Sequence, residues 1–438
     1  MLGQIRRRVT FASILVAAPL TLALAAPRSL AQTAAAPNSP RAQAQHYVVL
    51  VSLDGFRWDY PQRDAARNLL ALARQGASAP EGMLPGYPSL GFPNHLTLVT
   101  GLYPGHHGIL ADSFLDPVRQ ARFAASDPHA VADASWYAGT PLWSLAESQG
   151  MRAACLGWPA CQAKIAGFAP SYNPPDAGKL TAEARIREVL DWLQLPDAVR
   201  PHFIAIDDPA LDAEASRFGP DTPQTRAAVL RSDTFIGRLK AALDATRLPV
   251  DFVVVSDRGL AKPQGGWIAL DQFASLDGFE TVGTLLYGKS EPDRERLYNQ
   301  LKHAAAEFVV YRRKNVPANF YLSQNPRAGD PVIVANGPYA LRAHSAAAGK
   351  NSAPGDPPAT SAPTPGIDGL DARTQPEMKA IFFAAGPDIV KGKTLAPFEN
   401  VNVYPWLAHL LGLTPPKTDG SLNILSGTLR DGGGEPGD

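Results

Sequence analysis

Residues 47–54 have the sequence YVVLVSLD, an almost continuous apolar run that ends in an aspartate. The run has the length and the β-branched content of a parallel strand buried on both faces. Comparable runs occur at residues 203–206, 252–255 and 380–383, and helical patterns separate them at about residues 65–75, 181–193, 222–245 and 403–411. Strands that alternate with helices predict an α/β domain with a mostly parallel central sheet and helices on both faces.

Acidic residues follow three of these predicted strands directly: Asp54, Asp207 with Asp208, and Asp257. Open α/β sheets build their sites beyond the carboxyl ends of their strands. A single aspartate there is also a common turn or N-cap residue, so one of them would indicate little. Several aspartates at one edge favour a functional site.

The composition is that of a soluble globular protein: 438 residues, 45% hydrophobic and 19% charged. The length suits one large domain or two smaller ones. The formal net charge is zero, so no overall field draws the chain to nucleic acid, and we expect no nucleic-acid partner.

The N-terminus has the pattern of a targeting segment. Arginines at 6–8 precede an apolar stretch at 9–26, and small residues follow near 29–31. We therefore predict a signal peptide at residues 1–31 and an exported protein, periplasmic or secreted. A stretch of about 18 residues is marginal for crossing a bilayer, so a retained N-terminal membrane anchor is the alternative. After removal of the signal no membrane span is expected.

Composition changes divide the remaining chain. Residues 32–45 are rich in Ala, Pro and Ser and predict a flexible lead-in, residues 46–425 form the domain, and 426–438 are a flexible tail. A run of Ala, Gly, Ser, Pro and Thr at about 344–365 predicts a disordered insertion. Only Cys155 and Cys161 are present. In an oxidising compartment they could pair, and two free thiols are equally compatible with the sequence.

Several motifs between residues 47 and 422 point to one family. They are SLDGFR at 52–57, FPNHLTLVTGLYP at 92–104, HHG at 106–108, GTPLW at 139–143, WP at 158–159, FGP at 218–220, VVSD at 254–257 and FENV at 398–401. Together they resemble the nucleotide pyrophosphatase/phosphodiesterase family of the alkaline phosphatase superfamily. The resemblance implies an alkaline-phosphatase-like fold that cleaves small phosphoesters, with two zinc ions held by Asp and His and a threonine nucleophile.

The metal ligands that the resemblance implies are only partly present. Three aspartates are kept, as Asp54, Asp212 and Asp257. The three histidine positions carry other residues: Ser216, Arg258 and, within the sequence GIDG at 366–369, Asp368. The last assignment is the least secure, because the insertion precedes it. We expect His95, His106 and His107, like the other six histidines, to be surface or packed core residues rather than ligands.

The catalytic positions of the family have changed as well. The threonine nucleophile precedes the Phe-Pro-Asn-His motif, and Gly91 stands there. The nearest hydroxyls, those of Ser89 and Thr97, should not reach the same place. The asparagine that helps to hold the phosphate corresponds to Asp112, whose carboxylate would repel a phosphoryl oxygen.

A site of carboxylates without histidine suits a hard cation. We therefore expect no binding of the family's two zinc ions, and a single Mg²⁺, Ca²⁺ or Mn²⁺ as the alternative. Buried carboxylates need a compensating charge, and Arg258 could supply it. We predict that Arg258 substitutes for a metal by pairing with Asp54 or Asp212. The alternative is a solvent-facing Arg258 beside protonated aspartates.

The sequence favours a family member with a degenerate active site, inactive in two-zinc phosphodiester hydrolysis and retained as an envelope binding or structural protein. One alternative is a phosphodiesterase or phosphatase that uses a hard divalent metal and activated water. Another is a shifted alignment in which Glu214 or Asp208 is a ligand. A small phosphoester remains a candidate ligand; no other partner can be predicted.

Overall fold

The computed structural model describes residues 36–345 and 365–430, and residues from Ala36 onward form one compact unit. The predicted signal peptide at 1–31 lies outside the described residues, as do most of the insertion and the end of the tail. Among the described residues, no helix has the length and apolarity needed to cross a membrane.

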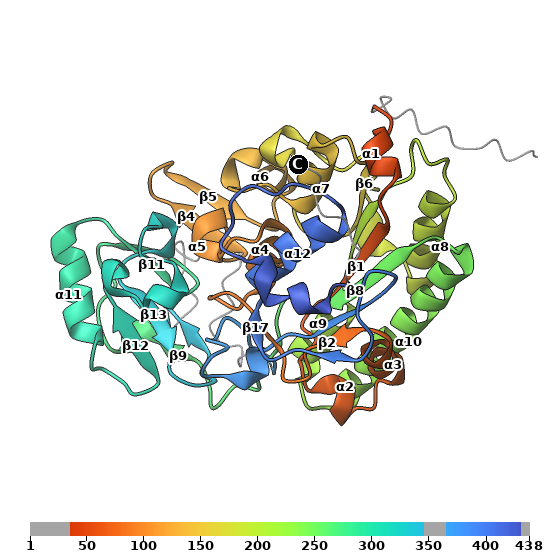
Figure 1. Ribbon diagram of the computed structural model, residues 1–438. Coiled ribbons are helices and arrows are strands. Elements are labelled where there is room, and N and C mark those ends of the chain that lie inside the picture. The colour runs from red at the N-terminus through yellow and green to blue at the C-terminus, as the bar shows by residue number, and fades with distance from the viewer. Residues whose placement is uncertain (1–35, 346–364, 431–438) are drawn as a thin grey trace, which may run out of the picture. The chain divides into compact units, whose positions relative to one another are not determined.

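A seven-stranded sheet forms the centre of the fold (Figure 1). Its strands, in spatial order, are β16 (Lys393–Thr394), β2 (Ala77–Ser78), β15 (Phe382–Ala385), β8 (Val250–Val255), β1 (Tyr47–Leu53), β7 (Phe203–Asp208) and β6 (Ala153–Leu156). Strand β1 pairs in parallel with β7 and β8, and β6 pairs in parallel with β7. Strand β15 runs antiparallel to both of its neighbours. The sheet is therefore mostly parallel, as the sequence predicts.

Alternate residues of β1 enter two separate cores, because successive side chains of a strand point to opposite faces. Val48 and Leu50 pack with α4 (Gly91–Thr100), α7 (Leu142–Ser148) and α12 (Val403–Leu410). Val49 and Val51 pack with α3 (Arg67–Gln75), α8 (Ala182–Leu193), α9 (Ala210–Phe218) and α10 (Pro223–Thr246). Both faces of the sheet are thus covered by helices (Figure 1).

Capping residues set the bounds of the predicted helices. The Thr222 hydroxyl accepts a hydrogen bond from the amide of Thr225, and Pro223 occupies the first helical position of α10. The Thr181 hydroxyl caps α8 in the same way. These signals explain why the expected ranges 222–245 and 181–193 agree closely with the helices.

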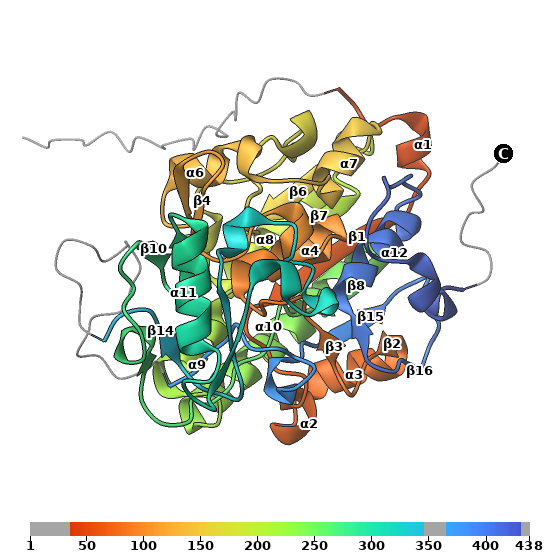
Figure 2. The same cartoon turned by 90° about the vertical axis from the view of Figure 1, so that its left-hand side faces the viewer.

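A smaller group of elements lies around α11 (Glu291–Leu301), which Figure 2 shows. It contains two antiparallel pairs, β10 (Phe279–Val282) with β11 (Leu285–Gly288) and β12 (Phe308–Tyr311) with β13 (Val332–Ala335). Its core is separate from the two cores of the sheet. The remaining elements are short: α1 (Pro40–Gln43), α2 (Tyr60–Arg63), α5 (Pro104–His107), α6 (Pro128–Ala132), β3 (Met83–Leu84), β4 (Ser113–Asp116), β5 (Ala121–Ala124), β9 (Ile268–Ala269), β14 (Leu341–Arg342) and β17 (Phe398–Glu399).

The ends of the domain differ from the expected boundaries. Residues 36–45 of the predicted flexible lead-in contain α1, and the buried Asn38 amide donates to the carbonyl oxygens of Asp197 (2.7 Å) and Arg200 (2.8 Å). Near the predicted tail, Thr428 is buried and accepts a hydrogen bond from the Trp406 indole at 3.0 Å. These hydrogen bonds satisfy buried polar groups, so the packed domain extends beyond 46–425 at both ends.

The two cysteines are paired. A disulfide joins Cys155 in β6 to Cys161, with an S–S distance of 2.02 Å. This settles the alternative that the sequence leaves open between a bridge and two free thiols.

Candidate active site

The carboxyl edge of the sheet gathers the predicted acidic residues. Asp54 directly follows β1, Asp257 lies two residues after β8, and α9 contributes Asp212. Backbone hydrogen bonds between Ala261 and Ile367 bring the following residue, Asp368, to the same place. Both oxygens of the fully buried Asp257 are engaged, one by the Gly55 amide at 3.0 Å and the other by Arg258 at 3.3 Å.

Arg258 lies at the centre of these aspartates and is only 6% exposed. Its Nε donates to Asp368 Oδ2 at 2.7 Å, its Nη1 to Asp54 Oδ1 at 2.8 Å, and its Nη2 to Asp212 Oδ1 at 3.0 Å. The guanidinium therefore pairs with Asp54 and with Asp212, and also with Asp257 and Asp368. We call Arg258 and its four aspartates the arginine cluster. The Arg258 side chain is not directed to solvent.

The four carboxyl groups of the arginine cluster outnumber its single guanidinium, and their pKa values reflect this. Burial raises the pKa of Asp54 well above its usual value, the Asp257 carboxylate raises it further, and Arg258 offsets part of this rise. Burial also raises the pKa of Asp212, against the lowering effect of Arg258. For Arg258, burial opposes the charged form, but the surrounding carboxylates more than compensate and raise its pKa. The raised pKa values shift Asp54 and Asp212 toward their protonated forms, which reduces the negative charge that Arg258 has to balance.

Gly91 faces the arginine cluster from the first turn of α4. A Cβ added there would lie 3.4 Å from Asp257 Oδ2 and 3.6 Å from Arg258 Nη2. The position of the family's nucleophile therefore adjoins the carboxylates, but glycine has no hydroxyl. Ser89 and Thr97 are fully buried, and the Thr97 hydroxyl donates to the Pro93 carbonyl at 3.2 Å.

Asp112 lies at some distance from Arg258, on the wall of a cavity that also reaches Asp368. The cavity has a volume of about 670 Å³, and its lining includes Tyr87, Trp267 and Tyr339. Enclosure by the protein raises the pKa of Asp112, and the Asp368 carboxylate raises it further. The raised pKa shifts the Asp112 carboxyl toward its neutral, protonated form, and this side chain brings no positive charge to the cavity.

His95 is a residue whose place in the site the sequence reasoning missed. Its Nε2 lies 3.0 Å from both Ser52 Oγ and Asp207 Oδ1, and its Nδ1 lies 3.0 Å from the Gly91 carbonyl. Burial alone would lower the pKa of His95, but the Asp207 and Asp257 carboxylates raise it to about 10, so the imidazole is charged at neutral pH. Its spacing of four residues from Gly91, one helical turn, was the available signal.

The other sequence candidates lie outside the arginine cluster. Asp208 pairs with Arg185 at 2.8 Å, and Glu214 faces Arg231 at 3.5 Å. Ser216 is half-buried on α9 beside Gly366. Because Asp208 and Glu214 bind other arginines, the geometry gives no support to either of them as a replacement ligand.

The donor set does not fit two zinc ions. Zinc in proteins prefers imidazole and thiolate ligands. The arginine cluster offers carboxylates that are already bound to a guanidinium, and the one nearby imidazole, that of His95, hydrogen-bonds to Asp207 and Gly91. A permanently charged guanidinium among the ligands would also repel a second cation.

Comparison with known proteins identifies the family. The family model described as type I phosphodiesterase / nucleotide pyrophosphatase matches residues 48–356. The chain belongs to this family. It is 32% identical over 399 residues to an uncharacterised pyrophosphatase/phosphodiesterase of Schizosaccharomyces pombe, covering 86% of this chain and 79% of the yeast protein. It is 28% identical to human ectonucleotide pyrophosphatase/phosphodiesterase family member 7, covering 93% and 88% of the two chains.

Solved structures agree with this family assignment. Human ectonucleotide pyrophosphatase/phosphodiesterase 5 superposes with a TM-score of 0.78 at 25% identity, covering 88% of this chain and all of that chain. The murine protein, solved as an inactive variant in complex with AMP, has the same score and coverage. The alkaline-phosphatase-like α/β fold predicted from the sequence is confirmed.

Proposed function

We propose that this family member does not carry out two-zinc phosphodiester hydrolysis and acts instead as a binding or structural protein of the cell envelope. The observation that carries the proposal is Arg258, whose guanidinium binds four aspartates, all of which the motif alignment assigns to metal-ligand positions of the family. A guanidinium that binds one oxygen of each aspartate occupies the place of a metal ion, and the reaction would lack its Lewis acid.

Two further features support an inactive site. Gly91 offers no attacking oxygen, so the covalent step of the family lacks its nucleophile. The charge of the Arg258 guanidinium is also taken up by four aspartates, so little of it remains to attract a phosphoester anion.

The hydrolysis assay tests the proposal directly. The purified protein is stripped of metal, supplied in turn with Zn²⁺, Mg²⁺, Mn²⁺ or Ca²⁺, and given a chromogenic nucleotide phosphodiester. We expect no turnover above buffer with any metal. Turnover that disappears in both Asp54→Ala and Asp257→Ala, but persists in the control Asp176→Ala at an exposed ion pair with Lys179, would overturn the proposal.

One observation favours a second candidate function, hydrolysis by a hard divalent metal and activated water. Asp54, His95 and Asp257 present potential ligand atoms that all lie within 4.8 Å of one another. Binding of Mg²⁺, Mn²⁺ or Ca²⁺ there would require the arginine cluster to open. Calorimetric titration of each ion into wild type and Asp54→Ala decides: heat that only the wild type gives would support this second function.

Restoring the family residues separates the missing nucleophile from the missing metals. We expect Gly91→Thr alone to give no activity, because Arg258 still holds the aspartates. Combining it with Arg258→His, Ser216→His and Asp368→His should create zinc binding, measured by elemental analysis. Turnover by Gly91→Thr alone would contradict the proposed role of Arg258.

The envelope location and the ligand are part of the same proposal. The relatives' names include ectonucleotide pyrophosphatase/phosphodiesterases and a venom phosphodiesterase, and the Cys155–Cys161 bridge suits an oxidising compartment. A small phosphoester is the candidate ligand by family, whereas the charge of the site favours a neutral one. Calorimetry with AMP and adenosine distinguishes them; we expect adenosine to bind at least as tightly as AMP.

A further inference from the structure

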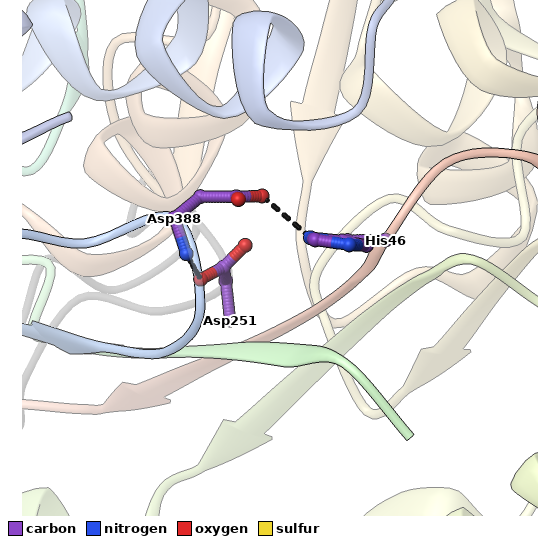
Figure 3. Close-up of side chains that lie close together, drawn as sticks. All are labelled: His46, Asp251 and Asp388. Carbon is purple, nitrogen blue, oxygen red and sulfur yellow. Dashed lines mark hydrogen bonds and ion pairs between the residues drawn. The ribbon is translucent and has the colours of Figure 1, made fainter. Parts of the chain in front are cut away.

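A second cluster of ligand-type side chains lies at the amino edge of the sheet, opposite the arginine cluster (Figure 3). His46 immediately precedes β1, and Asp251 is the second residue of β8. Asp388 follows β15, and it reaches this edge because β15 runs antiparallel to its neighbour β8. Three segments far apart in the sequence therefore converge here.

The three side chains point toward one another. His46 Nδ1 lies 2.8 Å from Asp388 Oδ2, and the Asp388 amide donates to Asp251 Oδ1 at 3.1 Å. One potential ligand atom from each residue lies within 4.8 Å of the other two. In Figure 3 the second oxygen of Asp251 points into the space between the Asp388 carboxylate and the His46 ring.

That second oxygen is the observation that points to a ligand. Asp251 is fully buried, and its Oδ2 has no hydrogen-bond partner among the described residues. A buried carboxylate oxygen without a partner carries an unfavourable desolvation energy. The nearby Arg430 lowers the pKa of Asp251 through its charge, but its Nε donates to the Ile389 carbonyl instead. A bound cation would therefore give this Asp251 oxygen the partner that it lacks.

The surrounding backbone leaves room for this carboxylate. Gly386 follows β15, and a Cβ added there would lie 2.2 Å from Asp251 Oδ1 and 2.6 Å from Asp251 Cα. Only glycine permits this close approach. The fold thus holds the Asp251 carboxylate beside the turn that carries Asp388.

We propose that His46, Asp251 and Asp388 bind one divalent transition-metal ion of the zinc type. An imidazole with two carboxylates matches the ligands that zinc accepts, whereas Mg²⁺ and Ca²⁺ prefer oxygen alone. The ion replaces the proton between His46 and Asp388, and water completes its coordination. Ligand atoms around tetrahedral zinc lie about 3.3 Å apart, so the His46 side chain, which is partly exposed, moves outward slightly.

The chemistry of the cluster also allows a shared proton in place of an ion. Burial and the Asp388 carboxylate raise the pKa of Asp251 to about 8, so a protonated Asp251 could donate to Asp388. A metal ion and a shared proton differ in a measurable way, because only the ion couples stability to metal concentration. The inference does not depend on whether the arginine cluster is catalytic.

The test uses Co²⁺ as a spectroscopic probe and Zn²⁺ as the ion. The metal-free full chain is titrated with Co²⁺ while visible absorption is recorded, and its Tm is measured with and without Zn²⁺. We expect one equivalent of Co²⁺ to give visible bands and Zn²⁺ to raise the Tm by several degrees. His46→Ala and Asp388→Asn should each weaken binding by more than about tenfold and remove the Tm shift.

Two controls locate the binding. His106→Ala removes a comparable His–Asp pair, formed with Asp419 at 2.7 Å but without a third carboxylate, and should change nothing. Asp54→Asn disables the other group of potential ligands and should keep the Co²⁺ spectrum. A wild type that binds no Co²⁺ would mean a shared proton only, and undiminished binding in His46→Ala would place the ion elsewhere. Either outcome overturns the inference.

Discussion

Arg258 makes more ion pairs than any other described side chain of the candidate site. Its guanidinium is buried among four carboxylates, and its planar fork lets three of its nitrogens bind different aspartates. Removing one partner of a buried ion pair leaves uncompensated charge, which costs about 3–5 kcal/mol. The arginine cluster should therefore be a determinant of folding as well as of the proposed inactivity.

Replacing Arg258 should destabilise the protein strongly. We expect Arg258→Ala to lower the free energy of unfolding by about 3 kcal/mol or more at pH 7, measured by urea denaturation. Arg258→Lys should recover only part, because an ammonium cannot reproduce the three-way geometry. Arg231→Ala, which removes an exposed arginine facing Glu214, is the control and should change stability by less than about 1 kcal/mol. Equal losses in the two alanine variants would contradict this account.

His95 should make stability depend on pH in the alkaline range. Its pKa is raised from 6.5 to about 10, so its charged form stabilises the fold fully below pH 6.5. This contribution is lost as pH rises through about 10. We expect wild type to lose on the order of 1–3 kcal/mol more than His95→Gln between pH 6.5 and 10, measured by urea denaturation at each pH. Parallel profiles would show that His95 is not charged in the folded protein.

Among the elements, α1 is a single helical turn, and the side chain of Asn38 just before it holds this segment against the rest of the domain. Asn38 makes two donor bonds to backbone carbonyls and accepts from the Arg152 amide at 2.7 Å. Asn38→Ala would leave these groups unsatisfied, and we expect it to lower the free energy of unfolding by about 1–3 kcal/mol. Arg41→Ala, at an exposed position of α1, is the matched control. Limited proteolysis should release residues before 46 faster in Asn38→Ala alone.

The sequence predicts some elements well and others poorly, for identifiable reasons. Strand β1 has the expected bounds because its apolar run is continuous. Helix α4 was not predicted, since Gly91, Phe92 and Pro93 open it and Thr and Val close it, so its stability comes from burial rather than propensity. The direction of β15 was also missed, because periodicity indicates a strand but not its orientation.

The sequence likewise predicts some contacts of the candidate site and not others. Motif spacing located Asp54, Asp212 and Asp257, and the charge argument predicted a partner for Arg258. Spacing could not show that Asp368 joins the same guanidinium, since that contact depends on the bridge between Ala261 and Ile367. The cluster of His46, Asp251 and Asp388 was invisible for the same reason, because its three segments meet only in the folded sheet.

For the molecule as a whole, the disulfide bears on the proposed oxidising compartment. Exported protein should contain no free thiol, and mass spectrometry should detect two added alkyl groups only after reduction. Replacing both Cys155 and Cys161 by alanine should lower the free energy of unfolding by about 2 kcal/mol, since the closed loop is short. A free thiol in protein isolated from the cell envelope or the medium would contradict the proposed oxidising compartment.

If the site is inactive as proposed, the space around Gly91 restricts how catalysis could arise there. A Cβ at that position would already touch the Arg258 guanidinium at 3.6 Å, so the outer atoms of a threonine directed the same way would overlap it. The mutational path is therefore ordered: the arginine must leave before a nucleophile brings any advantage. Because losing the arginine first would destabilise the protein, each single step backward is disfavoured, and the altered site is held by the fold itself.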